Sequence, residues 1–315
     1  MRAYVLRRLL AMLATLLGVS LIVFGLMRLI PGTVVEQLLG QSALITEETL
    51  RSLRVFFGLD RPWYVQFGEW AWGLLRGDLG HSWRSDRPVA ALILSRLPVS
   101  AELAVLSVAW SLIIGIPLGI VGAVRRGSAD GFVRIVSTLG LSVPAFWQGT
   151  LLILLFSVYL QWMPSLQWIP FTQDPLGNLS IMALPALTLG TATAAMISRM
   201  TRSAMLDVLG QDYVRTARAK GLGPQRVLLR HALRNALIPI ITVAGVQMGY
   251  ILGGIVVVED VFSLPGVGRL LLDAIFQRDY PVVQGTILVG AALFMLLNFT
   301  VDLLYAVIDP RIQYQ

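Results

Sequence analysis

DYVRTARAKGLGPQRVLLRHALRNALIPI, residues Asp212–Ile240, is a basic segment in a chain that is otherwise mostly apolar. Against a single acid, Asp212, it carries these basic side chains: Arg215, Arg218, Lys220, Arg226, Arg230 and Arg234. Glycine and proline interrupt it near its middle, and an apolar run follows it. From its residues alone, the segment could be a solvated loop, a nucleic-acid patch, a helix on a lipid surface or a docking surface for another protein.

The local pattern predicts two helices joined by a glycine turn. Residues 212–220 contain no helix breaker and include good helix formers. Gly221 suits the position just after a helix end, and Pro224 suits the first turn of the next helix. In that next helix one stripe is apolar, whereas arginines spaced by four lie on another face: Val227, Leu228, Ala232, Leu233 and Leu237, against Arg226, Arg230 and Arg234.

The chain as a whole has the composition of a membrane protein. Hydrophobic residues make up 56% of 315 positions, charged residues 14%, and the mean hydropathy is +0.73. Soluble domains carry about 25% charged residues, so an all-α polytopic membrane protein is predicted. The chain has no cysteine, and its two histidines, His81 and His231, are far apart, so we expect no metal site.

Crossing about 30 Å of hydrocarbon takes about 20 apolar residues. Six windows meet this length, and prolines at 117, 144 and 185 are expected to kink or break their helices. The predicted spans are Leu9–Met27, Leu103–Val124, Ile135–Tyr159, Pro175–Ser198, Asn235–Val258 and Tyr280–Val301.

The distribution of charge predicts the orientation of these spans. With both termini in the cytoplasm, fifteen of the 25 Lys and Arg residues lie inside, in agreement with the positive-inside rule. The outer loop 28–102 is then the longest non-spanning segment, and the inner loop 199–234 contains the basic stretch. A further outer loop, 259–279, is expected to hold a turn at Ser263 and a short helix from about Val267 to Phe276.

The basic stretch is a poor candidate for nucleic-acid binding, whereas a purely structural loop, a helix on lipid and a docking helix all stay possible. Tyr213 is its only Phe, Trp or Tyr, so a stacking platform for nucleic acid is lacking. Basic residues near anionic lipid contribute about 1 kcal/mol each. The first helix is shorter than the ~12–15 residues that an isolated helix needs, so it must pack against something. Lipid and protein both remain open as that surface.

Other positions are candidates for transport rather than for chemistry. Asp302 is an acid within the last span, which makes it a functional-site candidate. Glu259 and Asp260, with Phe262 beside them, could lie at a substrate entrance or gate, or be a solvated acid pair in a loop. The chain has no phosphate-binding loop of the G-x-x-x-x-G-K-[ST] type, so we expect no ATP hydrolysis by this subunit.

The segments GQDYVRTARAKGL and RHALRNALIPI resemble the cytoplasmic EAA loop of ABC-importer permeases, and most closely the dipeptide, oligopeptide and nickel branch. Arg215-Thr216 stand where the general pattern has Glu-Ala, and Pro239 falls later than usual. Further segments agree in order along the whole chain: GLDRPWYVQF, GLLRGDLGHSW, SRLPVSAELA, GIPLGIVGAVRRGS, LSVPAFWQG, MTRSAML, VVVEDVFSLPGVGRLLLDAI, RDYPVVQG and VDLLYAVIDPRI.

This resemblance implies a type I ABC-importer permease fold in a bacterial inner membrane, with a long first outer loop and a cytoplasmic coupling helix. It implies a second homologous permease as heterodimer partner, two ATPase subunits that carry ATP and Mg, and an extracytoplasmic solute-binding protein. The chain itself would be no enzyme and would hold no cofactor. The coupling contact would consist of Tyr213, Arg215, Thr216, Ala217, Arg218, Ala219, Lys220, Gly221 and Leu222.

The function expected from the resemblance is one half of a pathway that imports di- or oligopeptides by alternating access. Nickel chelates, glutathione and oligosaccharides are the alternative substrates. An alternative of another class is an ion- or proton-coupled carrier or channel, in which Asp302 would be the key group.

Overall fold

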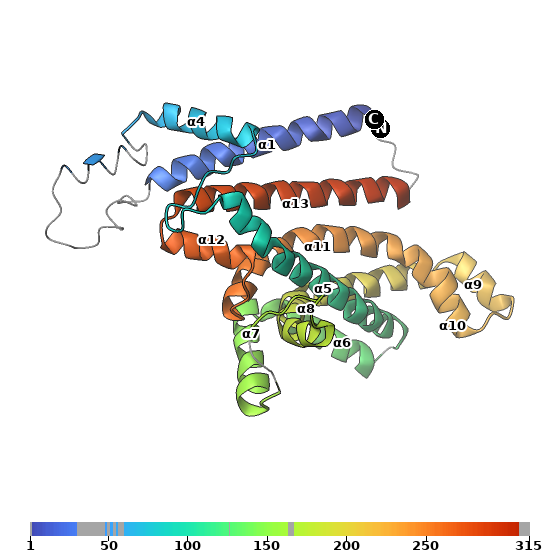
Figure 1. Cartoon of the computed structure of the whole chain (residues 1–315). Coiled ribbons are helices and arrows are strands. Elements are labelled where there is room, and N and C mark those ends of the chain that lie inside the picture. Colours follow the sequence, from blue (N-terminus) through green and yellow to red (C-terminus); the bar gives the residue numbers. More distant parts are fainter. Residues whose placement is uncertain are drawn as a thin grey trace. The chain divides into compact units, whose positions relative to one another are not determined.

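The computed structural model describes residues 2–29, 48, 51–52, 55, 60–125, 127–162 and 167–308, with side chains between residues 6 and 301 of these ranges. In this part of the chain the regular structure is helical, apart from one isolated bridge between His81 and Pro88. The expectation of an all-helical chain is confirmed for these residues (Figure 1). The chain forms two compact units, Met1–Pro98 with Gly266–Met295, and Val99–Pro265 with Leu296–Gln315.

The first unit contains helices from both ends of the chain. They are α1 (Arg2–Leu29), α4 (Trp63–Leu75), the start of α5 (Val89–Val124), α12 (Val267–Phe276) and most of α13 (Tyr280–Ile308). The apolar core includes Val89, Ile93, Ala274 and Val283. The carboxylate of Asp279, just before α13, accepts hydrogen bonds from the Ser82 hydroxyl and from the Trp83 N–H at 3.1 Å. The helix predicted from about Val267 to Phe276 is confirmed as α12.

The second unit is built around α8, the most buried of the candidate spans. The Asp174 carboxylate caps α8 by accepting from the Gly177 N–H at 3.0 Å, which satisfies one of the free donors of its first turn. The elements of this unit, besides the end of α5, are α6 (Ser128–Ser142), α7 (Ala145–Ile153), the π-helix η1 (Leu154–Tyr159), α8 (Pro175–Leu209), α9 (Asp212–Ala219), α10 (Pro224–Arg226), the π-helix η2 (Val227–Leu233) and α11 (Arg234–Val261).

Small residues let α5 and α8 approach closely. A Cβ on Gly115 would lie 2.6 Å from the Ala194 carbonyl oxygen, and one on Gly190 would lie 2.8 Å from the Ser107 carbonyl oxygen. Glycines at such spacing are typical of membrane helices that pack through their backbones, because lipid supplies no hydrophobic force between helices.

The third predicted span is broken at Pro144, and the interruption expected from this proline is confirmed. The chain bends by 100° between α6 and α7, where Val143 is extended and Pro144 precedes α7. A residue before proline is disfavoured in the helical region, which accounts for the extended Val143. By contrast, Pro185 and Pro239 lie inside continuous helices. Within the described residues, five helices are long and apolar enough to cross a membrane, or up to six if the bent pair is one span.

Several helices extend beyond the predicted spans. Helix α5 begins at Val89, so the last part of the expected outer loop is helical, and α8 continues to Leu209. Helix α11 continues to Val261, so Glu259 and Asp260 lie in its last turn rather than in a loop. From the sequence we also predict that residues 1–315 form a single transmembrane permease domain, and this stays a prediction.

Candidate functional site

Helix α9 follows α8 after a two-residue connection and confirms the helix predicted from Asp212 (Figure 1). Two of its side chains are buried, Val214 and Ala217, and both pack against Val227 of η2. The remaining side chains of α9 and its C-cap are exposed: Asp212, Tyr213, Arg215, Thr216, Arg218, Ala219 and Lys220. The packing that an eight-residue helix needs is thus supplied on one side by this chain, and the other side is available to another surface.

The end of α9 is a Schellman motif. Gly221 has φ of +79°, its N–H donates to the Arg218 carbonyl at 2.9 Å, and the Leu222 N–H donates to the Ala217 carbonyl at 3.3 Å. Leu222 also packs against the buried Val214 and Ala217 of α9, and such an apolar contact frequently accompanies the motif. The prediction of Gly221 as the helix-ending residue is confirmed. A Cβ at Gly221 would meet no atom within 4 Å, so the positive φ alone favours glycine here.

Tyr213 ties α9 to the start of α11. Its hydroxyl accepts a hydrogen bond from Asn235 Nδ2 at 2.7 Å, and the same amide nitrogen donates to the His231 carbonyl at 3.1 Å. Arg215 lies 3.5 Å from the Asp212 carboxylate, and both side chains are well exposed. Exposed pairs of this kind contribute 1 kcal/mol or less, so the helix is held by its apolar side and by Tyr213.

The helix that follows the glycine turn has the predicted stripe. Val227 and Ala232 are buried. Ala232 packs in one cluster with Met205 of α8, and Val227 packs in another with Ala217 of α9. The arginines at 226, 230 and 234 are exposed, as predicted. Two features were not predictable from the residue pattern: the helix runs unbroken from Pro224 to Val261, and its residues Val227–Leu233 form a π-helix. A π-helical turn within an α-helix is rare and frequently marks a functional position.

The candidate gate residues separate into buried and exposed groups. Glu259 has no exposed surface, and its carboxylate accepts a hydrogen bond from the Ser100 hydroxyl of α5. Phe262 is buried beside Gly149 of α7, where an added Cβ would lie 3.0 Å from its ring. Asp260 is exposed. The interpretation of Glu259 as part of a solvated loop pair is therefore wrong, because its side chain is packed inside the second unit. Asp302 lies in α13, outside the residues whose side chains the structure describes.

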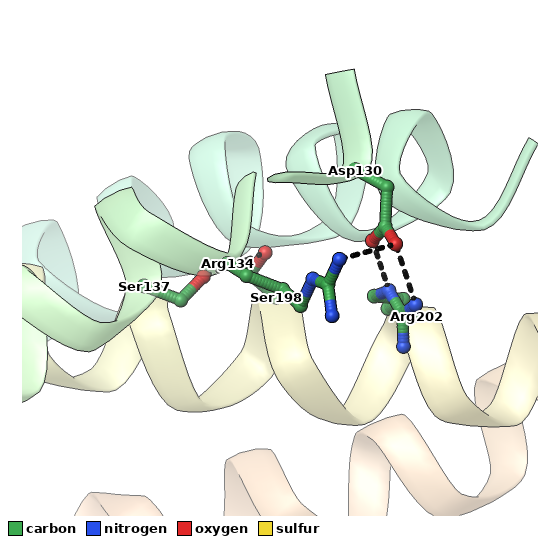
Figure 2. Close-up of polar contacts among 5 residues, drawn as sticks. All are labelled: Asp130, Arg134, Ser137, Ser198 and Arg202. Atoms are coloured by element: carbon green, nitrogen blue, oxygen red, sulfur yellow. Dashed lines mark hydrogen bonds and ion pairs between the residues drawn. The ribbon is translucent and has the colours of Figure 1, made fainter. Parts of the chain in front are cut away.

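An ion-pair cluster near the end of α8 was not singled out by its sequence (Figure 2). Arg202 of α8 donates through Nε and Nη2 to the two carboxylate oxygens of Asp130 on α6, at 2.6 and 2.9 Å. Arg134, one turn along α6, lies 3.3 Å from the same carboxylate. Ser137 donates to the Ser198 hydroxyl at 3.4 Å. From the sequence alone, Arg134 and Arg202 were assigned only to the basic residues on the cytoplasmic side.

Among the described residues, no group of three or more His, Cys, Asp and Glu side chains could hold a metal ion. The site consists instead of an exposed basic helix, the rigid turn that ends it and the ion-paired helices that lead to it. Such an arrangement can bind another surface and can pass on a displacement.

Solved structures show which fold this is. The methionine ABC transporter MetNI, in an inward-facing conformation, matches with a TM-score of 0.58 and 18% identity, over 70% of this chain and 97% of that chain. An amino acid ABC transporter crystallised with histidines matches with a TM-score of 0.50 and 15% identity, over 71% of this chain and 95% of that one. At these identities the likeness concerns the fold, which is that of ABC-importer permeases.

Relatives align over the full length. A putative peptide transport system permease protein of Brucella abortus is 45% identical over 315 residues, covering all of both chains. The di/tripeptide transport system permease protein of Pseudomonas aeruginosa is 43% identical over 336 residues, and the dipeptide transport system permease protein of Escherichia coli K12 is 41% identical over 339 residues. Each of these also covers all of both chains. The resemblance to the peptide branch is confirmed.

Two family models complete the comparison. Residues 1–104 match the N-terminal model of binding-protein-dependent transport system membrane components. Residues 115–314 match the model of the binding-protein-dependent transport system inner membrane component. The chain therefore belongs to the family of binding-protein-dependent transport system inner membrane components, the multi-pass permease subunits of ABC importers.

Proposed function

We propose that this chain forms half of the pathway through which an ATP-driven importer carries di- or oligopeptides across a bacterial inner membrane. Support for the substrate comes from the relatives named for peptide transport, which align with the chain from end to end. The partners are a second, homologous permease, two cytoplasmic ATPases that bind ATP and Mg, and an extracytoplasmic solute-binding protein. Both termini lie in the cytoplasm, in keeping with the distribution of Lys and Arg.

Helix α9 is the surface that meets an ATPase subunit. The single observation that carries this assignment is its one-sided burial: Val214 and Ala217 are enclosed, whereas the other side chains from Asp212 to Lys220 are exposed. The basic side chains Arg215, Arg218 and Lys220 suit acidic groups on the partner, and the small Thr216 and Ala219 allow close approach. Gly221 and Leu222 complete the contact by fixing the turn behind it.

The contacts of α9 with η2 and its connection to α8 suit a mechanism of alternating access. It is packed on η2 and follows α8 directly, so closure of the ATPase pair on ATP would displace α9 together with the ends of α8 and of the helix that contains η2. Opening toward the outside then receives the substrate from the solute-binding protein. Helices transmit such a displacement well because a packed element moves as a body.

The last turn of α11 is the proposed gate region. Asp260 is exposed and suits an entrance that attracts the amino terminus of a peptide. Glu259 and Phe262 are buried against α5 and α7, so they suit a gate whose side chains are uncovered only when these helices separate. Asp302 is proposed as a further pathway residue, since intramembrane acids are rare outside pathways.

Reconstitution into proteoliposomes tests the proposal. The chain is combined with the second permease, the ATPases and the binding protein, and uptake is measured with labelled di-, tri- and longer peptides. A nickel chelate, glutathione and an oligosaccharide complete the panel. Uptake of peptides that requires ATP and the binding protein is expected. Uptake that persists without the ATPases would contradict the proposal and favour an ion-coupled carrier, with Asp302→Asn as the next variant.

A further inference from the structure

Arg202 joins α8 to α6 through an ion pair in which two nitrogen atoms of its guanidinium donate to one carboxylate. Its Nε and Nη2 atoms lie 2.6 and 2.9 Å from the two oxygens of Asp130. Figure 2 shows the guanidinium facing the carboxylate edge to edge, with Arg134 approaching one oxygen from α6 itself. A planar fork bound at two points fixes orientation as well as distance.

The stem of Arg202 also contacts α5. A Cβ built on Gly122 would lie 3.3 Å from Arg202 Cδ, so this side chain passes directly over the α5 backbone. One turn earlier on α8, the hydroxyl of Ser198 accepts a hydrogen bond from Ser137 of α6. Arg202 therefore links its own helix, α8, to both α5 and α6.

Burial makes this pair costly to break. The Asp130 side chain keeps 14% of its surface exposed and that of Arg202 keeps 28%, whereas Arg134 is 65% exposed. A carboxylate that is partly shielded from water is stabilised by a charged partner, and removal of that partner leaves its charge less well compensated. The exposed Arg134 is screened by water and contributes much less. Of the two arginines beside Asp130, Arg202 is therefore the main partner, and it is the one that belongs to α8.

The position of the pair connects the candidate docking helix with the candidate gate. Arg202 lies about two turns before α8 ends, and α9 follows that end after Gly210 and Gln211. Asp130 lies in the first turn of α6, whose other end bends by 100° into α7. Gly149 of α7 is in turn packed beside Phe262. A displacement of α9 can therefore pass along α8, across the Arg202–Asp130 pair to α6, and through α7 to Phe262.

The geometry points to Arg202 as a positioning residue for transport: with Asp130 it makes α6 and α7 follow α8 when the ATPases move α9. This role rests on the proposed function and adds to it a residue that touches neither substrate nor ATPase. If the pair is kept, each ATP cycle moves both helices. If it is broken, α8 slides past α6, and hydrolysis continues without the matching change at the gate.

The test measures peptide uptake per ATP hydrolysed by the full complex in proteoliposomes. Arg202→Gln and Asp130→Asn are compared with Arg199→Gln, which removes an exposed arginine from the same helix. In the two pair variants the ratio of uptake to hydrolysis is expected to fall about fivefold or more, the lower end of coupling between distant sites. Arg199→Gln is expected to keep the ratio. The exchanged pair Asp130→Arg with Arg202→Asp is expected to restore part of the loss.

Three results would overturn the inference. One is an unchanged ratio in both pair variants. Another is equal loss in Arg199→Gln. The third is failure of both pair variants to assemble with the ATPases, measured by co-purification, because the pair would then be a folding element only. If the unaltered complex shows no ATP-dependent uptake, the proposed function fails instead, so the two failures are distinguished by the wild-type measurement.

Discussion

Gly119 of α5 faces the main chain of Ser198 of α8 so closely that a Cβ on Gly119 would lie 2.5 Å from the Ser198 carbonyl oxygen. The nearest side-chain atom, Cβ of Thr201, would be equally close. Real side chains do not approach backbone atoms to this distance, so the two helices can be this close at residue 119 only because it is glycine. This contact lies one turn of α8 from Arg202 and holds α5 against the same helix.

Substitution of Gly119 by alanine is therefore expected to destabilise the permease. The added methyl group must push α5 away from α8, and overpacking of this kind costs about 1–3 kcal/mol. Gly253→Ala is the matched control, since a Cβ there meets nothing within 4 Å and Gly253 lies in the helix α11. Thermal unfolding in detergent should show a lower midpoint for Gly119→Ala and an equal or higher one for Gly253→Ala. Equal midpoints for both variants would show that the close approach does not persist in the membrane protein.

Gly221→Ala is expected to loosen α9 at its end. The left-handed conformation costs a residue with a Cβ about 1–2 kcal/mol, so the Schellman turn should open more often. Gly223 provides the control because its φ of −62° suits alanine. Hydrogen exchange of the α9 amides should accelerate in Gly221→Ala and not in Gly223→Ala. The reverse order, or identical exchange in the two variants, would contradict the assignment of Gly221 as the residue that fixes the turn.

The absence of cysteine from the chain allows the docking surface to be mapped directly. A thiol-directed photocrosslinker on Ala219→Cys, which is exposed, should attach to an ATPase subunit in the assembled complex. The same reagent on Ala217→Cys should react poorly because Ala217 is buried against Val227. Labelling of lipid but not of protein at residue 219 would instead indicate that α9 lies on the inner leaflet.

Alanine substitution is expected to affect stability differently at the neighbouring residues Glu259 and Asp260. Glu259→Ala removes the acceptor of the buried Ser100 hydroxyl and leaves a space in the core, so stability should fall by at least about 1–3 kcal/mol. Asp260→Ala changes an exposed side chain and should keep the unfolding midpoint. Glu259→Gln keeps the shape; if it also keeps stability but reduces uptake, Glu259 belongs to the gate. Full uptake in Glu259→Gln would limit this carboxylate to a role in packing.

The comparison of prolines shows why the interruptions of helices were only partly predictable. Every proline inside a predicted span lacks the same N–H and restricts the same preceding residue. Pro144 nevertheless breaks its helix, whereas Pro185 is buried within α8 and Pro239 lies within α11. The position of a proline in the sequence shows where a helix can be interrupted. Whether the interruption occurs depends on whether neighbouring helices satisfy the freed backbone groups, which no single sequence shows.

The sequence by itself determined the features that depend on neighbouring residues: apolar windows long enough to cross a bilayer, the helix from Asp212, the turn at Gly221 and the stripe that begins at Val227. These follow from backbone preference and from a period of 3.6 residues, both of which are local. Only the tertiary structure decided that Asp130 and Arg202, far apart in the chain, form one ion pair, that Glu259 is buried against Ser100, and that the break at Pro144 is a bend of 100°. The physical reason is that charge pairing, burial and helix bending depend on which helix surfaces pack together. The apolar surfaces of these helices are similar, so the sequence pattern is compatible with many packing arrangements.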